Sequence, residues 1–223
     1  MGRSRVSAVM SEAATKKDKL TRKRRAALSA AERLDIAAVE SLRPVLRQGW
    51  ARRLGALGNL ADEPPLLALG AATALAGAVR RDRSLGRAGL RMLLAQGVAI
   101  ALKEFGKNRI DRSRPDALLE KKRYRMRRGR SRSAELRSFP SGHTAGAFAV
   151  AGALAREYPR HRTAAYLAAG AFGALQVLRR AHFPGDVAAG LVLGLGAKSA
   201  GNAAAELLFR RSKRAVGGAP DTA

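Results

Sequence analysis

Five segments of the chain are almost entirely apolar, and charged or Pro- and Gly-containing stretches separate them. They cover residues 66–79, 89–102, 144–155, 163–178 and 187–197. Each is rich in Ala, Gly and Leu, and none alternates between apolar and polar positions as a half-buried strand would. The pattern therefore predicts five helices, and it contains no internal repeat.

The length of these segments is compatible with a soluble helical bundle and with a membrane-embedded one. All are shorter than the roughly 20 residues with which a helix crosses a bilayer, which suits the core of a soluble bundle. Small residues, however, are typical of close contacts between membrane helices, and flanking Arg or Lys side chains can extend a span by snorkelling. We favour an all-α, membrane-embedded bundle of five to six helices.

A further apolar pattern precedes the five segments. Over residues 34–57 the apolar positions recur at helical spacing, but acidic residues and arginines interrupt them. This predicts one amphipathic helix, and Trp50 beside arginines suits a membrane–water interface. A surface helix of a soluble protein has the same pattern, and whether the segment spans or lies on a membrane stays open.

The ends of the chain differ from its middle. Residues 1–33 are polar and basic and are expected to form a flexible tail. The bundle domain is expected over residues 34–209, with a basic loop insert at 116–137, and residues 210–223 are expected to be a disordered tail. No secretory signal is expected, because the basic run at 16–25 has no compact apolar core after it.

The charge balance indicates an anionic partner. Lys and Arg number 43 against 17 Asp and Glu, a net charge of +26, which fits nucleic acid, an acidic membrane or a phosphorylated substrate. The densest run, residues 121–133, is either a solvated loop or a contact with anionic lipid head groups. Its near lack of aromatic residues disfavours base stacking, so no nucleic acid is expected. Cysteine is absent, which excludes thiolate metal sites.

A Pro-Ser-Gly-His stretch, residues 140–143, stands directly before the third apolar segment. A helix that begins there has unpaired N–H groups that attract an anion. Ser141 can cap that helix or donate to a phosphate oxygen, and Gly142 lets a ligand approach the backbone. With His143 as a titratable group, the stretch has the composition of an oxyanion cradle.

Two further clusters complement this stretch. His182 and Asp186 are four residues apart across a Pro-Gly turn, so the carboxylate can hold one imidazole nitrogen and leave the other as a nucleophile. Lys107 and Arg114 are seven residues apart, which on a continuing helix places both on one face. Two fixed cations there can neutralise a phosphoryl group.

In this order, Lys-x6-Arg-Pro, Pro-Ser-Gly-His and His-x3-Asp resemble the three signature motifs of the type 2 phosphatidic acid phosphatase superfamily. That superfamily includes membrane lipid phosphatases, soluble bacterial acid phosphatases and vanadium-dependent haloperoxidases. The resemblance covers about residues 62–200. It implies that His182 attacks phosphorus to form a phosphohistidine, that Asp186 orients His182, and that His143 protonates the leaving group. It also implies that the phosphoryl oxygens are held by Lys107, Arg114, Ser141 and the Gly142 amide. No metal or other cofactor is expected, and vanadate should bind as a phosphate mimic.

One position departs from the family pattern. The third motif of the family begins Ser-Arg, but Leu175 and Gln176 stand there. A neutral amide binds phosphate more weakly than a guanidinium does, so Gln176, Arg179 and Arg180 are all kept as candidate phosphate contacts. His161 is interpreted as a solvated loop residue.

The sequence thus predicts a multi-pass phosphatase of the inner membrane that acts on a lipid phosphate or diphosphate monoester and contacts anionic lipids. One alternative is a soluble acid phosphatase or haloperoxidase with the same pocket. Another is a catalytically weak basic protein that binds membranes or nucleic acid. The side on which the site lies stays open. Related lipid phosphatases usually carry it away from the cytoplasm, whereas the basic run at 121–133 favours the cytoplasmic side.

Overall fold

The computed structural model describes residues 28–217, and it is built almost entirely of helices. In chain order the helices are α2 (Ala30–Ser41), α3 (Arg43–Leu46), α4 (Gly49–Ala56), α5 (Glu63–Val79), α6 (Arg83–Lys107), α7 (Pro115–Lys121), α8 (Gly142–Glu157), α9 (Arg162–Leu178) and α10 (Pro184–Gly217). Short 3-10 turns are η1 (Leu57–Ala61), η2 (Ala134–Leu136) and η3 (Pro159–His161), and two strands, β1 (Ile110–Arg112) and β2 (Met126–Arg128), pair with each other.

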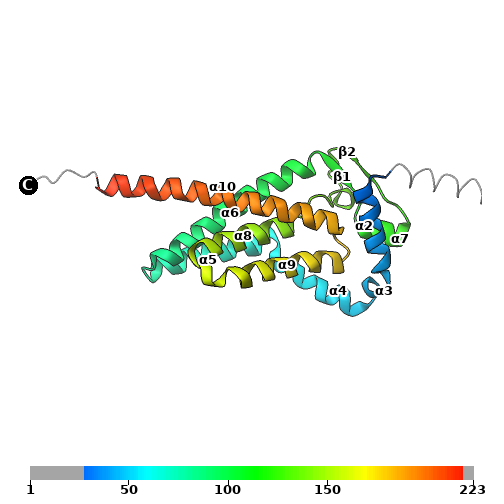
Figure 1. Cartoon of the computed structure of the whole chain (residues 1–223), viewed down its shortest axis with the longest axis horizontal. Helices are drawn as coiled ribbons and strands as arrows, with labels where there is room; N and C mark the ends of the chain where they lie inside the picture. Colours follow the sequence, from blue (N-terminus) through cyan, green and yellow to red (C-terminus); the bar gives the residue numbers. More distant parts are fainter. Residues whose placement is uncertain (1–27, 218–223) are drawn as a thin grey trace, which may run out of the picture.

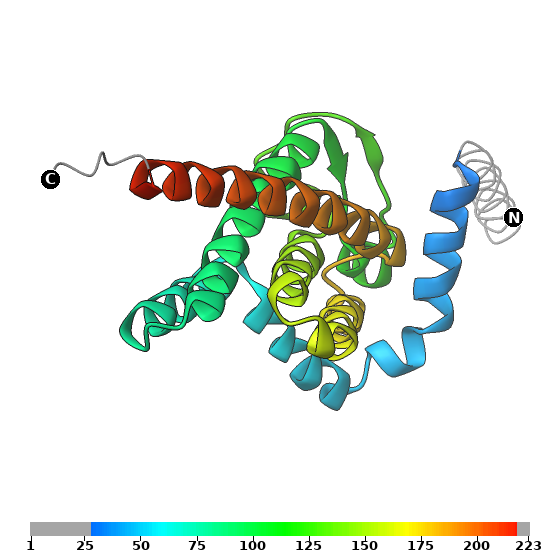
Figure 2. The same ribbon diagram turned by 60° about the vertical axis from the view of Figure 1, so that its left-hand side comes forward.

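The five predicted helices correspond to α5, α6, α8, α9 and α10, and they form an elongated bundle (Figure 1). Helix α8 is its centre, because every residue from 144 to 153 is buried. Helices α6, α9 and α10 surround α8, and α2 lies across one end of the bundle (Figure 2). Each of the five is longer than its apolar segment, because charged residues continue the helix beyond the apolar stretch.

Small residues form the interior of the bundle. Alanine predominates in the core that α6, α8 and α10 share. A Cβ at Gly89 would overlap the backbone of Ala74, and one at Gly194 would overlap the Ala145 carbonyl, so these helices touch backbone to backbone. Meanwhile large apolar side chains face outward, among them Leu75, Leu167 and Val192. Small residues inside and large apolar residues outside are typical of helices that pack within a membrane.

The helix predicted over residues 34–57 is wrong. The chain there forms three short helices, α2, α3 and α4, of 12, 4 and 8 residues. Pro44 has no N–H to continue the hydrogen bonds of α2, and Gln48 is extended before α4 begins. At about 1.5 Å per residue none of the three can cross a bilayer. Trp50 remains half exposed, as an interfacial position would be.

The basic insert folds. Strands β1 and β2 pair antiparallel, with Ile110 opposite Arg128 and Arg112 opposite Met126, and α7 forms most of the connection between them. Residues 121–133 are therefore ordered: they end α7, form β2 and continue beyond it. The hairpin fixes the backbone on either side of Arg112, and after β2 the Ser131 N–H donates a hydrogen bond to Asp111 at 2.8 Å.

Both predicted tails overlap helices. Helix α2 already begins at Ala30, because Ser29 and Glu32 form a capping box. Helix α10 continues to Gly217, since the Ala- and Leu-containing residues 203–208 favour helix. The expected boundaries at 33 and 210 therefore fall inside helices. The rest of the two predicted tails, residues 1–27 and 218–223, lies outside the residues that the structure describes.

Candidate active site

The Pro-Ser-Gly-His stretch forms the N-terminus of the central helix. Ser141 is the N-cap of α8, and its Oγ accepts hydrogen bonds from the Thr144 N–H at 3.4 Å and the Thr144 hydroxyl at 3.0 Å. Gly142 and His143 are the first two helical residues. The free N–H groups of the α8 N-terminus are therefore located directly beside the His143 side chain.

His182 follows α9 in a tight turn and is almost completely buried. Its Nδ1 is 2.7 Å from the backbone carbonyl of Ser138. A carbonyl can only accept, so Nδ1 carries the proton and Nε2 has a free lone pair. The nearer oxygen of Asp186 is 3.7 Å from Nδ1, beyond hydrogen-bonding distance. The Ser138 carbonyl, rather than Asp186 as expected, thus sets the tautomer.

Asp186 instead joins the three motifs. Its carboxylate is fully buried and accepts hydrogen bonds from the Arg112 guanidinium at 2.6 Å, the Ser138 hydroxyl at 2.5 Å and the Phe183 N–H at 2.9 Å. In addition, its carbonyl accepts the Ser141 N–H at 3.1 Å. One residue thereby holds the turn of His182, the start of α8 and strand β1 together.

The two imidazoles are neighbours. The rings of His143 and His182 have their centroids 6.2 Å apart and meet edge to face at 61°. The Nε2 atom of His143 lies 3.7 Å from Asp62 and has no hydrogen-bond partner among the described residues. Residues of the second and third motifs thus lie side by side in one site.

Side-chain cations supply the positive charge of this site. Arg114 donates to the Ala134 carbonyl at 2.9 Å and to the Ala181 carbonyl, next to His182, at 3.3 Å. The charges of Arg114 and Lys107 both act on His182. Within residues 28–217 no group of three or more His, Asp or Glu side chains is arranged to hold a metal ion.

We expect the phosphoryl transfer that the motifs imply to keep its rate in mildly acidic solution. Burial, followed by the charges of Arg114 and Lys107, lowers the pKa of His182 below its ordinary 6.5, although Asp186 opposes the shift. A lowered pKa keeps the imidazole neutral at pH 6.5, so the acid limb of the pH–rate profile should lie below that pH. Stability should fall on acidification through pH 6.5, because the unfolded imidazole takes up a proton there before the folded one does. A kcat/KM profile whose acid limb lies above pH 7 would contradict this assignment.

Lys103 is a member of the site that the sequence analysis missed. It lies one helical turn before Lys107 on α6 and is buried. Its stem crosses Gly142 so closely that a Cβ at Gly142 would overlap it. Lys103 forms ion pairs with Glu63 and with Glu104, the latter at 3.6 Å. The i, i+4 spacing from Lys107 is the signal that could have revealed it.

The three candidates at the altered third motif have different surroundings. Gln176 is fully buried and donates to the Gly58 carbonyl at 3.2 Å, so its amide serves packing against η1. Arg179 contacts the Asn59 side chain, and its charge acts on both His143 and Arg114. Arg180 instead forms ion pairs with Asp116 and Glu120 of α7. His161 is exposed in η3, between α8 and α9, as expected.

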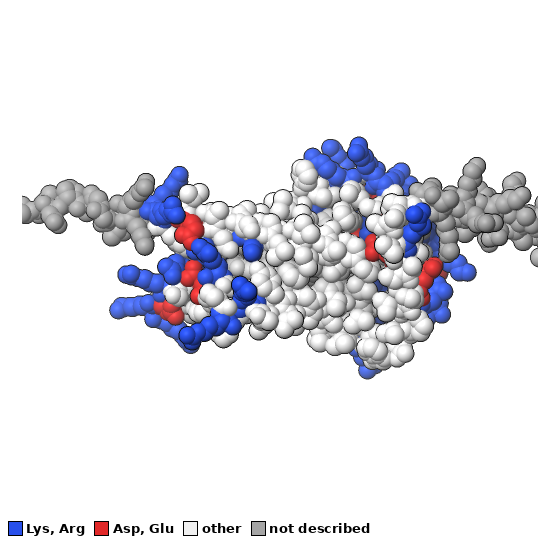
Figure 3. All heavy atoms as spheres, viewed as in Figure 1, with Lys and Arg blue, Asp and Glu red and all other residues white. Residues whose placement is uncertain are grey.

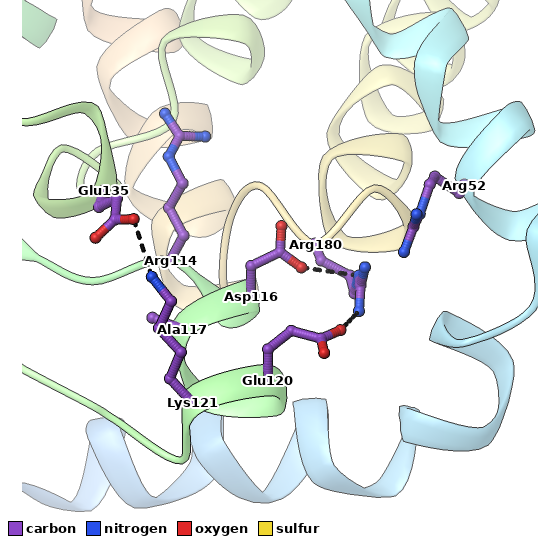
Figure 4. A pocket seen from close by; sticks show the side chains of 8 residues that line it. All are labelled: Arg52, Arg114, Asp116, Ala117, Glu120, Lys121, Glu135 and Arg180. Carbon is purple, nitrogen blue, oxygen red and sulfur yellow. Dashed lines mark hydrogen bonds and ion pairs between the residues drawn. The ribbon is translucent and has the colours of Figure 1, made fainter.

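A cavity of about 520 Å³ adjoins the site (Figure 4). It is lined by Arg52, Arg114, Asp116, Ala117, Glu120, Lys121, Glu135 and Arg180. Arg180 reaches Asp116 at 2.9 Å and Glu120 at 2.7 Å, while the Arg114 guanidinium points away from these acids (Figure 4). Arg114 thus lines this cavity, whereas neither His143 nor His182 does.

Comparison with known proteins agrees with this geometry. The model of the PAP2 superfamily matches residues 88–199, which contain all three motifs. The chain belongs to the PAP2 superfamily. The resemblance drawn from the motifs and the all-α, membrane-embedded bundle expected from the sequence are both confirmed.

Two solved PAP2 structures are similar to the chain. The first transmembrane PAP2 type phosphatidylglycerolphosphate phosphatase from Bacillus subtilis is 26% identical, with a TM-score of 0.52, over 81% of this chain and 88% of that one. LpxE from Aquifex aeolicus is 25% identical, with a TM-score of 0.45, over 73% of this chain and 92% of that one. No curated protein matches the sequence.

Proposed function

We propose that this PAP2 protein is a membrane phosphatase that hydrolyses a lipid phosphate or diphosphate monoester through a phosphohistidine on His182. The observation that carries the proposal is the state of the His182 ring. Its Nδ1 proton is held by the Ser138 carbonyl, which leaves Nε2 free to attack, and the second imidazole lies beside it. A nucleophile next to an acid–base group is the arrangement that covalent phosphoryl transfer needs.

In the first step, His182 Nε2 attacks phosphorus while the bond from phosphorus to the leaving oxygen breaks. His143, which takes up a proton together with the anionic substrate, gives that proton to the leaving oxygen. In the second step, His143 takes a proton from water, the water oxygen attacks phosphorus, and the bond to Nε2 breaks to release phosphate. Asp186 keeps the turn of His182 in place through its three hydrogen bonds.

Charge on the phosphoryl oxygens is stabilised by fixed donors. Lys107, Arg114 and the newly found Lys103 supply positive charge, and the free N–H groups at the start of α8, next to Ser141 and Gly142, supply hydrogen bonds. We assign the missing third-motif cation to Arg179, because its charge acts on both His143 and Arg114. This set neutralises the phosphoryl group without a metal ion.

A lipid substrate is supported by the surface of the molecule. Lys and Arg gather at the two ends of the bundle, and a band without charged residues lies between them on the face drawn in Figure 3. Exposed leucines such as Leu69, Leu75 and Leu167 belong to helices of this bundle. By length and composition, α6 is the one helix in residues 28–217 that reaches the dimensions of a membrane span. The Bacillus relative acts on a lipid phosphate according to its name. We infer a multi-pass protein of the inner membrane with its site at one end of the apolar band.

A basic cavity near the end of α6 can bind anionic lipids. Asn108, Arg109, Arg130 and Arg132 line a cavity of about 390 Å³. Arg109 stacks on the exposed Phe105 ring, with its guanidinium carbon 3.4 Å from the ring centroid. Clustered arginines at head-group level attract anionic lipids.

Phosphate release by the purified, detergent-solubilised protein tests the proposed function. We expect release from at least one lipid phosphate or diphosphate in a panel that also contains water-soluble phosphoesters. The activity should persist in a chelator, because side chains neutralise the charge, and should be inhibited by vanadate, which mimics the phosphoryl group. Release from soluble esters alone would contradict the lipid assignment, and loss of activity in the chelator would contradict the metal-free mechanism.

Arg179→Gln should lower kcat by about a hundredfold, the typical cost of removing one donor to the reacting oxygens. Gln176→Arg should not raise activity, because position 176 is fully buried against η1, and a longer, charged side chain there costs about 1–3 kcal/mol of stability through overpacking alone. Arg53→Gln, an exposed arginine on α4, is the charge-matched control. A rate gain in Gln176→Arg together with full activity in Arg179→Gln would show that Arg179 does not replace the family arginine.

A further inference from the structure

Helix α2 lies outside the residues matched by the family model, yet it reaches the active site. It crosses the end of the bundle (Figure 2) and packs through the fully buried Val39 in a cluster with Phe183, the neighbour of His182. Asp35, one turn before Val39, is 7% exposed. A carboxylate is rarely buried to this extent unless it is paired.

Both oxygens of Asp35 have partners from the PAP2 motifs. One accepts a hydrogen bond from the Arg112 guanidinium at 2.7 Å, and the other accepts the Gly185 N–H at 2.7 Å. Gly185 precedes Asp186, and a Cβ at Gly185 would overlap the Asp35 carboxylate. Only glycine therefore lets Asp35 reach the backbone at the start of α10.

Arg112 connects Asp35 with Asp186. Its Nη1 donates to Asp186 at 2.6 Å and its Nη2 donates to Asp35 at 2.7 Å. The Tyr124 hydroxyl lies 3.2 Å from Nη2, and the Phe183 ring lies 4.5 Å from the guanidinium carbon. The guanidinium is thus held in one orientation between two carboxylates.

Asp35, as the second carboxylate on Arg112, changes the net charge of the Asp35–Arg112–Asp186 triad. Arg112 alone would neutralise Asp186, whereas two carboxylates and one guanidinium leave one net negative charge on the triad, and its member Asp186 lies 3.7 Å from His182. We propose that Asp35 is a positioning residue of the phosphatase site, which fixes the start of α10, directly after the turn of His182, through Gly185 and leaves the Asp35–Arg112–Asp186 triad with a net negative charge. The inference rests on the proposed function, and it extends the active site to the N-terminal helix.

Asp35→Asn tests this inference. Asparagine keeps the size of the side chain and can still accept from Gly185, but it removes the negative charge. We expect kcat to fall by about 10–100-fold, the usual effect of changing an outer-shell partner, with KM nearly unchanged. The His182 imidazolium also faces Asp186, Arg114, Lys107 and His143, and loss of a negative charge nearby makes the imidazolium less stable. The acid limb of the pH–rate profile should therefore move to lower pH.

Val39→Ala is the matched control. It loosens the same helix against Phe183 without changing any charge, so it should lower the melting temperature and leave the acid limb where it is. Asp35→Glu should restore the acid limb of the wild type even where its longer stem lowers kcat. A wild-type kcat and an unmoved acid limb in Asp35→Asn would overturn the inference while the proposed function stands. If wild-type protein releases no phosphate from any ester in the panel, both fall together.

Discussion

His182→Ala is expected to reduce phosphate release by about a thousandfold or more, the size of effect seen when a covalent nucleophile is removed. No other described residue presents a free imidazole nitrogen beside His143, since His161 is exposed in η3 away from the site. The measurement is the single-turnover rate of phosphate release with a lipid phosphate. His161→Ala, also a loss of one imidazole, should retain the wild-type rate.

The outcome separates two mechanisms. A His182→Ala protein that keeps a tenth or more of the rate would mean that water attacks phosphorus directly and that the ring serves only to bind. A folded His182→Ala protein with no measurable rate agrees with nucleophilic attack, and its vanadate binding then reports whether the cation pocket survives.

Arg112→Leu is expected to destabilise the fold by about 3–5 kcal/mol, because it leaves buried carboxylates without their cation. Burial opposes the charge of Arg112, but Asp186 and Asp35 together more than offset this and raise its pKa, so the residue is cationic at every pH of interest. Thermal unfolding in detergent measures the change, and a loss of this size corresponds to a melting temperature lower by about 10 °C.

An exposed ion pair supplies the comparison for Arg112. Arg156 on α8 pairs with Glu206 at 3.8 Å, with side chains 62% and 39% exposed, and exposed ion pairs contribute only about 0–1 kcal/mol. Arg156→Leu should therefore leave the melting temperature almost unchanged. Equal melting temperatures for the two variants would contradict the description of Asp35, Arg112 and Asp186 as a tightly coupled buried triad.

Local patterns were sufficient for most of the fold. Runs of Ala, Gly and Leu gave the five bundle helices, and the three motifs gave the histidines and Lys107 and Arg114. They were less informative at helix ends, because charged residues continue a helix once its apolar part is embedded. They also failed over residues 34–57, where Pro44 interrupts a pattern that otherwise has helical periodicity.

Contacts between distant residues could not be predicted in the same way. Asp35 and Gly185 are separated by 150 positions, and nothing near Asp35 in the sequence marks it as buried. Arg112 looked like one more arginine of a basic stretch, and only the β1–β2 pairing with the packing of α2 places it against Asp186. Similarly, the tautomer of His182 depends on the Ser138 carbonyl, 44 positions away, which no side-chain motif encodes.

The most direct test of the account is to locate the phosphoryl group during turnover. Wild-type protein is mixed with a radiolabelled lipid phosphate, quenched in alkali within the first turnover, and digested for peptide mapping. The account predicts a label on His182 that alkali leaves intact, that acid removes, and that is absent from His182→Ala. A label on another residue, or phosphate release with no protein-bound label at any time within the first turnover, would contradict it.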